Sequence, residues 1–328
     1  MKLSYKFNDI LHQLRVKYVM HQYANKSRHV ERKHPELFKA VDCKMSCRHK
    51  ELWRRLGVNS DNRWLRFHVN LTGINDCRFF PEEVFFSRIE RMMNDCDAAG
   101  HGLDDKSELL YFVQKENRPD TVLRYVRGSF FDSDNNWLPR DVTSRILAGE
   151  LVGKTCRSSG GNGVELRDDF SVEWIEQDGG DTYEVQRKIG QCDFTAQFNK
   201  GSVNTVRMMT MRCPWNGEIV VCRSMLRMGV SDDVIDNMMK GGFCVCIGDK
   251  GQLGKYAFDY DGKRFEKHSV SGLAFEGKRH PEYKEMVEIA FAIHENILSY
   301  TLLSFDLVQR DDGTVCVIEI NATSQGIT

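Results

Sequence analysis

The chain has 328 residues, of which 41% are hydrophobic and 28% are charged, so it can bury a sizeable core and its composition excludes a disordered protein. No run approaches 18 consecutive apolar residues, and the first residues lack the apolar stretch of a secretory signal, so we expect neither a transmembrane segment nor a leader. Eleven cysteines, an odd number without a Cys-x-x-Cys pair, favour a cytoplasmic protein with reduced thiols.

The formal net charge of −1 conceals a basic N-terminal part. Residues 1–58 contain 14 Lys and Arg against five Asp and Glu, and five of the ten His. Such a segment suits an anionic partner, which could be nucleic acid, a membrane surface or a phosphorylated substrate, or it could be a solvated face that docks on the acidic remainder. Because it lacks the interleaved aromatic residues of a single-strand groove, we expect no nucleic-acid partner.

The first hundred residues are predicted to form an α/β segment. Residues 8–23 carry apolar side chains at helical spacing. Residues 64–71 alternate strictly between apolar and polar, which predicts a half-buried strand. Pro81 opens a further helix, since proline is favoured in a first helical turn.

From residue 104 onward the pattern predicts short helices and many strands. Asp104 or Asp105 can cap a short helix, and Asn216-Gly217 indicates a two-residue type I′ hairpin turn. A longer helix is expected over 281–300. The expected strands cover 121–132, 151–157, 164–170, 203–212, 218–228, 243–248, 255–260, 302–310 and 314–321.

The last two of these strands form a hairpin with the features of a metal site. If Asp312-Gly313 is its two-residue loop, paired residue numbers sum to 625, so Asp306 lies opposite Glu319 and Asn321 shares their face. Two carboxylates and an amide suit Mg²⁺. Opposed carboxylates repel, which favours a cation between them over an ordinary solvated hairpin face.

The sequence LVGKTCRSSGGNGV over 151–164 has the features of a phosphate-binding loop. Lys154 precedes a run of small residues, whose backbone N–H groups can approach phosphate closely. A P-loop is excluded, because the glycines follow the lysine and Ala148 stands where the first glycine is required. A lid between two strands or a plain glycine-rich turn remain as interpretations.

A phosphate loop followed by a magnesium hairpin resembles the ATP-grasp superfamily in content and in chain order. The phrases SVNTVR, DNMMKGGF, HPEY and EIN look like the sugar-transfer-associated ATP-grasp proteins. The resemblance implies an α/β (α+β) fold in which two lobes, 101–190 and 191–328, grip ATP. The basic segment 1–100 precedes them.

The resemblance also implies roles for individual residues. Asp306, Glu319 and Asn321 match the family's magnesium triad, and Arg207 resembles the arginine that contacts the transferring phosphate, so that Arg207 and Lys154 are the implied catalytic residues. The residues implied to bind ATP come from two lysines, the lid and the hinge between the lobes: Lys106, Lys154, Ser158, Ser159, Gly160, Gly161, Gly163, Glu184, Gln186, Ile189 and Asp193.

The implied activity is an ATP- and Mg²⁺-dependent ligase that activates a carboxylate as an acyl phosphate and joins it to an amine, in the synthesis or modification of a surface polysaccharide or sugar conjugate. An anionic sugar nucleotide would suit the basic N-terminal segment. Two alternatives stay open. One is a phosphotransferase on the same fold, and the other is a non-catalytic nucleotide-binding partner of a glycosyltransferase.

Overall fold

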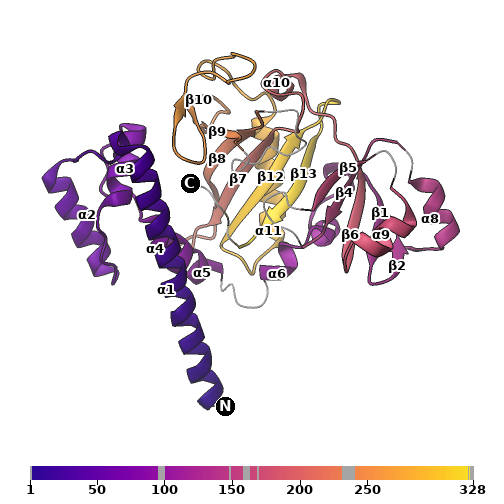
Figure 1. Cartoon of the computed structure of the whole chain (residues 1–328), viewed down its shortest axis with the longest axis horizontal. Helices are drawn as coiled ribbons and strands as arrows, with labels where there is room; N and C mark the ends of the chain where they lie inside the picture. Colours follow the sequence, from indigo (N-terminus) through magenta and orange to yellow (C-terminus); the bar gives the residue numbers. More distant parts are fainter. Residues whose placement is uncertain are drawn as a thin grey trace. The chain divides into compact units, whose positions relative to one another are not determined.

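The computed structural model describes residues 2–94, 100–147, 149–157, 163–167, 170–230, 241–323 and 325, with side chains of the first helix described from residue 13 onward (Figure 1). The chain divides into two compact units, the first made chiefly of Met1–Cys96 with Asp261–Lys263, the second of Asp97–Tyr260 with Arg264–Ile327. No helix in the described ranges has both the length and the hydropathy needed to cross a bilayer.

The regular structure described in the first unit is entirely helical. Its elements are α1 (Lys2–Lys33), the 3₁₀ helix η1 (Pro35–Phe38), α2 (Cys43–Arg55), α3 (Arg63–Thr72), α4 (Glu82–Val84), the π-helix η2 (Phe85–Ile89) and α5 (Glu90–Asn94). The helix expected over 8–23 is therefore confirmed as part of a longer one, and the helix expected after Pro81 is confirmed in three short pieces.

The strand predicted over 64–71 is wrong, because these residues form helix α3. Its apolar residues belong to two separate clusters. Trp64 and Phe67, three residues apart, pack with Phe38, whereas Leu65 and Val69, four residues apart, pack with Met45. Two helical stripes, each with its own partner, interleave in the sequence and imitate the alternation of a strand.

The second unit begins with helices and a six-stranded sheet. Its elements are α6 (Gly100–Leu103), η3 (Lys106–Glu108), α7 (Leu109–Phe112), η4 (Lys115–Asn117), β1 (Thr121–Val126), β2 (Ser129–Phe131), β3 (Trp137–Leu138), α8 (Arg140–Ile146), β4 (Leu151–Thr155), β5 (Val164–Arg167), α9 (Val172–Asp178) and β6 (Thr182–Arg187). The strand order is β3-β2-β1-β6-β4-β5, and all neighbours are antiparallel. Residues 121–132, expected as one strand, form a β1–β2 hairpin whose Arg127 and Gly128 both have positive φ, as a type I′ turn requires.

A seven-stranded sheet follows in the same unit. Its elements are α10 (Asp193–Ala196), β7 (Thr205–Arg212), β8 (Ile219–Met228), β9 (Phe243–Ile247), β10 (Leu253–Phe258), β11 (Arg264–Phe265), α11 (Tyr283–Asn296), β12 (Leu302–Gln309) and β13 (Val315–Asn321). The order is β11-β10-β9-β8-β7-β12-β13, and every pair is antiparallel.

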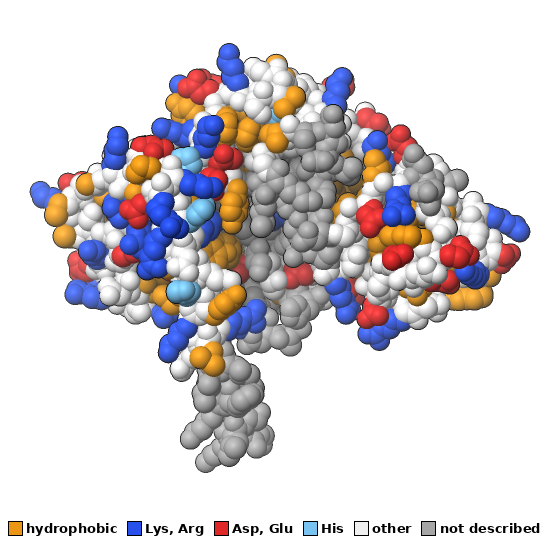
Figure 2. Space-filling model, in the orientation of Figure 1, with side chains coloured by type: hydrophobic (Ala, Val, Ile, Leu, Met, Phe, Trp, Pro, Cys, Tyr) orange, Lys and Arg blue, Asp and Glu red, His pale blue; other side chains and the backbone are white. Residues whose placement is uncertain are grey.

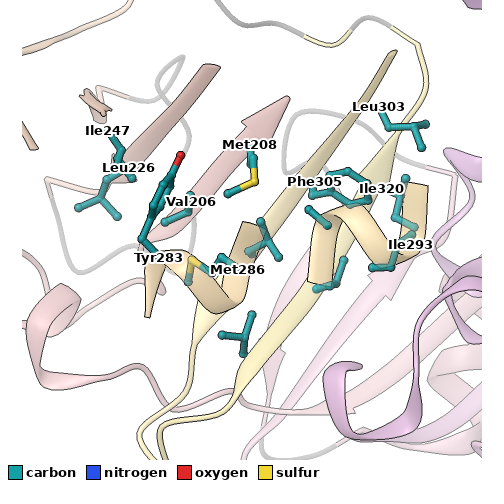
Figure 3. Close-up of a cluster of buried hydrophobic side chains, with 14 of the residues drawn as sticks. Val206, Met208, Leu226, Ile247, Tyr283, Met286, Ile293, Leu303, Phe305 and Ile320 are labelled. Atoms are coloured by element: carbon teal, nitrogen blue, oxygen red, sulfur yellow. The ribbon is translucent and has the colours of Figure 1, made fainter. Parts of the chain in front are cut away.

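The core of this sheet lies between its strands and α11. Met286 and Ile293 of the helix point toward Met208 and Phe305 of the strands, and all four are buried (Figure 3). Side chains alternate along a strand, so the residues between these core positions face the opposite side of the sheet.

The turn before β8 differs from its prediction. Gly217 has a φ of 76°, but Asn216 is not among the residues with positive φ, so the turn is not type I′. Cys213 N donates to Glu218 O at 2.8 Å and closes a four-residue loop that begins with Pro214. Proline at the first loop position fixes a negative φ, which favours a loop built on a type I turn.

Candidate functional site

One face of the seven-stranded sheet is charged. Val206 and Met208 of β7 belong to the core, so Arg207 faces the other side. Arg207 pairs with Asp306 of β12, which in turn pairs with Glu319 of β13. We call this the charged face of the sheet; it holds Thr205, Arg207, Arg223, Arg227, Ser304, Asp306, Glu319 and Asn321.

The predicted pairing of Asp306 with Glu319 is confirmed, although the predicted loop is not. The loop lies within 310–314, where Arg310 N donates to Thr314 O at 2.8 Å and only Gly313 has positive φ. Next to the loop, the numbers of paired residues sum to 624, as for Leu307 and Val317. The register shifts by one residue between Leu307 and Asp306, so that farther from the loop the paired numbers sum to 625. An irregularity of one residue in β13 thus compensates for the longer loop.

The two carboxylates of the hairpin are paired with cations. Asp306 accepts two hydrogen bonds from Arg207, Nε to Oδ1 at 2.6 Å and Nη2 to Oδ2 at 2.5 Å. Arg227 Nη1 lies 3.2 Å from the same Oδ2. Glu319 Oε1 lies 3.4 Å from Lys106 Nζ. The repulsion expected between Asp306 and Glu319 is therefore offset by three cationic side chains. The prediction that this repulsion favours a bound cation was wrong.

These cations also set the ionisation of Asp306. Burial raises the pKa of this carboxyl, but the guanidinium groups of Arg207 and Arg227 outweigh that effect, and the pKa is lowered. Asp306 is consequently a carboxylate at neutral pH, which is the form that a cation or a guanidinium group requires.

Asn321 completes the predicted triad as the third oxygen donor. It lies two residues beyond Glu319 on β13 and pairs with Ser304. Its Nδ2 atom is buried and has no hydrogen-bond partner in the described part of the chain. No three or more His, Cys, Asp or Glu side chains cluster among the described residues, so a hard cation here would need the amide oxygen besides the two carboxylates.

Lys106 is held by a segment that contacts both sheets. Lys106 N donates to Cys156 O at 3.1 Å, directly after β4. Asp104 Oδ1 accepts from Ala322 N at 2.8 Å, directly after β13. Asp105 begins η3 as its N-cap and accepts from Ser107 N, which confirms the expected cap. This segment therefore places Lys106 beside the closing hairpin.

Lys154 is a buried lysine. It is 7% exposed, and none of the described residues hydrogen-bonds or ion-pairs with its Nζ. Burial lowers the pKa of its ammonium group; Glu184 and Glu319 oppose the shift, and Lys106 adds to it. An anion beside this group would stabilise its charged form and offset the cost of burying it.

Glu184 and Gln186 of β6 are engaged with their own sheet. Glu184 Oε1 accepts from Thr121 Oγ1 at 2.7 Å and lies 3.2 Å from Arg124 Nε. Gln186 Nε2 donates to Glu184 Oε2 at 2.8 Å. Sequence reasoning missed Arg124, and the available signal was a single arginine within the otherwise apolar strand TVLRYV.

The linker between the sheets carries the remaining hinge residues. Ile189 is half-buried, and Asp193 is exposed at the start of α10. The linker is tied to both sheets, because Lys188 N donates to Glu150 O before β4, and Cys192 N donates to Gln309 O at the end of β12, each at 3.0 Å.

Most of the predicted lid lies outside the described residues, namely Ser158, Ser159, Gly160 and Gly161. Gly163 is described, has a φ of 72°, and accepts from Thr155 N at 2.9 Å through its carbonyl group. It therefore starts the antiparallel partner strand of β4, where positive φ favours glycine.

A large part of the second unit matches a known protein family. Residues 176–328 match the model of the family described as sugar-transfer associated ATP-grasp. No curated protein sequence matches the chain. The resemblance expected from the sequence is thus confirmed over the matched range, and the mixed α/β fold with two antiparallel sheets is confirmed as well.

Solved structures that resemble this one include three enzymes. N5-carboxyaminoimidazole ribonucleotide synthetase of Thermotoga maritima is 14% identical, with a TM-score of 0.38, over 67% of this chain and 42% of that one. The biotin carboxylase domain of Hydrogenobacter thermophilus 2-oxoglutarate carboxylase, in complex with MgADP, ADP and bicarbonate, is 11% identical, with a TM-score of 0.40, over 71% and 45%. D-alanine–D-alanine ligase of Bacillus anthracis is 15% identical, with a TM-score of 0.36, over 68% and 57%. The chain thus spans between about two fifths and three fifths of each of these proteins.

Proposed function

We propose that this chain, whose residues 176–328 are a sugar-transfer associated ATP-grasp domain, is an ATP- and Mg²⁺-dependent ligase that joins a carboxylate to an amine. We place the reaction in the synthesis or modification of a surface polysaccharide or sugar conjugate, with a sugar acid as the carboxylate. We also assign an anionic sugar nucleotide to the basic residues 1–58.

The observation that carries the proposal is the buried amino group of Lys154, which has no ion-pair partner among the described residues. Burial disfavours its charged form, and a polyphosphate would supply an anion that stabilises that form. Lys106, 8% exposed on its side chain, lies close enough to Lys154 to lower its pKa. The two lysines thus mark a place for several negative charges, as the phosphates of ATP provide.

The donor set of the charged face fits Mg²⁺. Asp306, Glu319 and Asn321 would hold the ion through oxygen atoms, the ligands that this cation takes. Bound there, the ion would supply positive charge to the phosphates and to the two carboxylates, which Arg207 and Lys106 now pair.

The chain's residues act mainly by positioning and by charge. The substrate carboxylate oxygen attacks the γ-phosphorus, the bond to the ADP oxygen breaks, and an acyl phosphate forms. The amine nitrogen then attacks the acyl carbon, phosphate leaves, and the nitrogen loses a proton to solvent. Arg207, on the charged face beside Asp306, stabilises the charge that develops on the transferring phosphoryl group.

The test is ADP release by the full chain with Mg·ATP and a panel of sugar acids and amines. The proposal expects release that requires both a carboxylate and an amine. A stable phosphorylated product formed without any amine would instead identify a phosphotransferase. Nucleotide binding with no turnover on the whole panel would identify a non-catalytic partner.

A matched pair of lysine variants tests the nucleotide site separately. Lys154→Met keeps the length of the side chain and removes its charge, so we expect the Kd for Mg·ADP to rise at least about tenfold in calorimetry. Lys255→Met removes the charge of an exposed lysine on β10 and should leave the Kd unchanged. Equal affinities of the two variants would refute the assignment of Lys154.

A further inference from the structure

Both carboxylate oxygens of Asp306 accept hydrogen bonds from guanidinium groups. Oδ1 accepts from Arg207 Nε at 2.6 Å, and Oδ2 accepts from Arg207 Nη2 at 2.5 Å and from Arg227 Nη1 at 3.2 Å. A carboxylate offers about four acceptor positions, and Mg²⁺ binds its oxygen ligands directly, at about 2.0–2.1 Å. A metal ion at Asp306 must therefore compete with two arginines for the same oxygen atoms.

The cations of this site are largely removed from water. The side chains of Lys106, Arg207 and Arg227 are 8%, 14% and 17% exposed. Figure 2 shows that many other Lys and Arg side chains extend from the surface, where water weakens their ion pairs. Charges interact more strongly away from water, so the attraction between these cations and the two carboxylates exceeds that in a surface ion pair.

The cluster as a whole is positive. Its two carboxylates, Asp306 and Glu319, are outnumbered by the three cations, so the five side chains carry a net charge of +1 when all are ionised. A positive cluster that is largely buried attracts an anion and repels a cation. A divalent cation is therefore unfavourable here until negative charge joins the cluster.

We propose that Lys106, Arg207 and Arg227 exclude the metal ion from the charged face, and that nucleotide phosphates make its binding favourable. Arg207 and Lys106 then exchange carboxylate oxygens for phosphate oxygens, since guanidinium and ammonium groups bind both. The oxygens of Asp306 and Glu319 become available to the metal ion. This inference rests on the proposed function for its nucleotide and adds an order of binding, in which the metal ion binds with or after the nucleotide and not before it.

The experiment measures Mn²⁺ binding to the full chain from the electron paramagnetic resonance signal of the free ion. Mn²⁺ replaces Mg²⁺ because it takes the same oxygen ligands. Without ADP, Arg207→Met should bind Mn²⁺ at least about tenfold more tightly than the native chain, because it removes one positive charge and two of the three hydrogen bonds to Asp306. With saturating ADP the two should bind Mn²⁺ about equally, so the coupling between ADP and Mn²⁺ is at least about tenfold weaker in the variant.

Three further variants locate the effect. Arg145→Met removes the same charge from α8, where the side chain is 78% exposed, and should bind Mn²⁺ as the native chain does. Arg207→Met/Asp306→Asn should return to the weak binding of the native chain, which places the ion at Asp306. Arg227→Met removes the longer hydrogen bond and should give a smaller gain; it replaces Arg207→Met in the comparison if urea unfolding shows that Arg207→Met does not fold.

Equal Mn²⁺ affinities of the native chain and Arg207→Met without ADP would overturn the proposal and leave the cations a structural role. An equal gain in Arg145→Met would overturn it too, because the effect would then be one of net charge alone. ADP binding, measured separately by calorimetry, tests the proposed function. If the native chain does not bind ADP, the proposed function is overturned, and the comparison without ADP still decides whether Arg207 excludes the metal ion.

Discussion

His280 should make the protein lose stability as the pH falls. The side chain is 1% exposed, and neither ring nitrogen has a hydrogen-bond partner among the described residues. The imidazole ring packs against Phe194 in an edge-to-face arrangement, with ring centroids 5.2 Å apart. Protonation here would create a buried charge without an acceptor, and burial lowers the pKa of His280 from 6.5 to about 4.

The size and sign of the effect follow from proton linkage. Above pH 6.5 the histidine is neutral in both the folded and the unfolded chain, so stability is unaffected. As the pH falls below 6.5, only the unfolded chain takes up the proton, and the free energy of unfolding falls by about 1.4 kcal/mol per pH unit until about pH 4. Between pH 7 and pH 5 the loss from His280 alone is about 2 kcal/mol.

The assay is urea unfolding, followed by tryptophan fluorescence, at pH 7 and pH 5. His280→Phe keeps an aromatic ring and removes the titrating group, so this variant should lose about 2 kcal/mol less than the native protein between the two pH values. The exposed His29, replaced as His29→Phe, is the control and should behave as the native protein does. Burial also lowers the pKa of His49, His268 and His294. These histidines are present in the native protein and in both variants, so their contributions to the pH-dependent loss of stability cancel in the comparison.

Equal losses of stability by the native protein and by His280→Phe between pH 7 and pH 5 would refute the role of His280. A variant that is less stable at both pH values does not affect the test, because the comparison is between the two pH-dependent losses. A smaller loss in His29→Phe would likewise show that the response does not depend on burial.

Three further predictions concern the second unit. Glu319→Gln should lower the stability of the ligand-free protein by about 1 kcal/mol, because Lys106 loses the carboxylate that pairs with it. The same variant should also lose the rise in Tm that Mg·ATP gives the native protein. If thermal melts show the ligand-free variant to be more stable than the native protein, the pairing of Glu319 with Lys106 is contradicted. Gly153→Ala should lower the free energy of unfolding in urea by about 1–3 kcal/mol, because a Cβ there would lie 2.0 Å from the hydroxyl oxygen of Tyr183. Gly102→Ala is the control and should leave the free energy of unfolding unchanged, because a Cβ at Gly102 meets open space. Arg207→Lys should lower kcat about a hundredfold in the ADP-release assay, while the Kd for Mg·ADP should change by less than about threefold. The reason is that the charge on the transferring phosphoryl group develops only in the catalytic step. An unchanged kcat would reject the catalytic role of Arg207.

Local patterns determined the closing hairpin. Asp306 and Glu319 lie 13 residues apart in sequence, and two adjoining apolar strands joined by a turn have few alternative registers. The pairing was therefore predictable even though the loop was assigned wrongly, because the register shift in β13 compensated for the longer loop.

Tertiary structure decided what surrounds that hairpin. Arg207 reaches Asp306 across 99 residues of sequence and Arg227 across 79, and Lys106 reaches Glu319 from near the start of the second unit. No local pattern specifies such distant partners, so the sequence suggested two repelling carboxylates where the fold supplies paired ones.

The same division explains the error at α3. The identities of its apolar residues were readable in the sequence, but their period was ambiguous. Trp64 and Leu65 are adjacent in sequence and yet pack against different clusters, and only the positions of Phe38 and Met45 separate one stripe from the other. The sequence by itself therefore determined which side chains are apolar and which can carry charge. The period of α3, the pairing of the carboxylates and the burial of Lys154 depended on contacts between residues far apart in the chain.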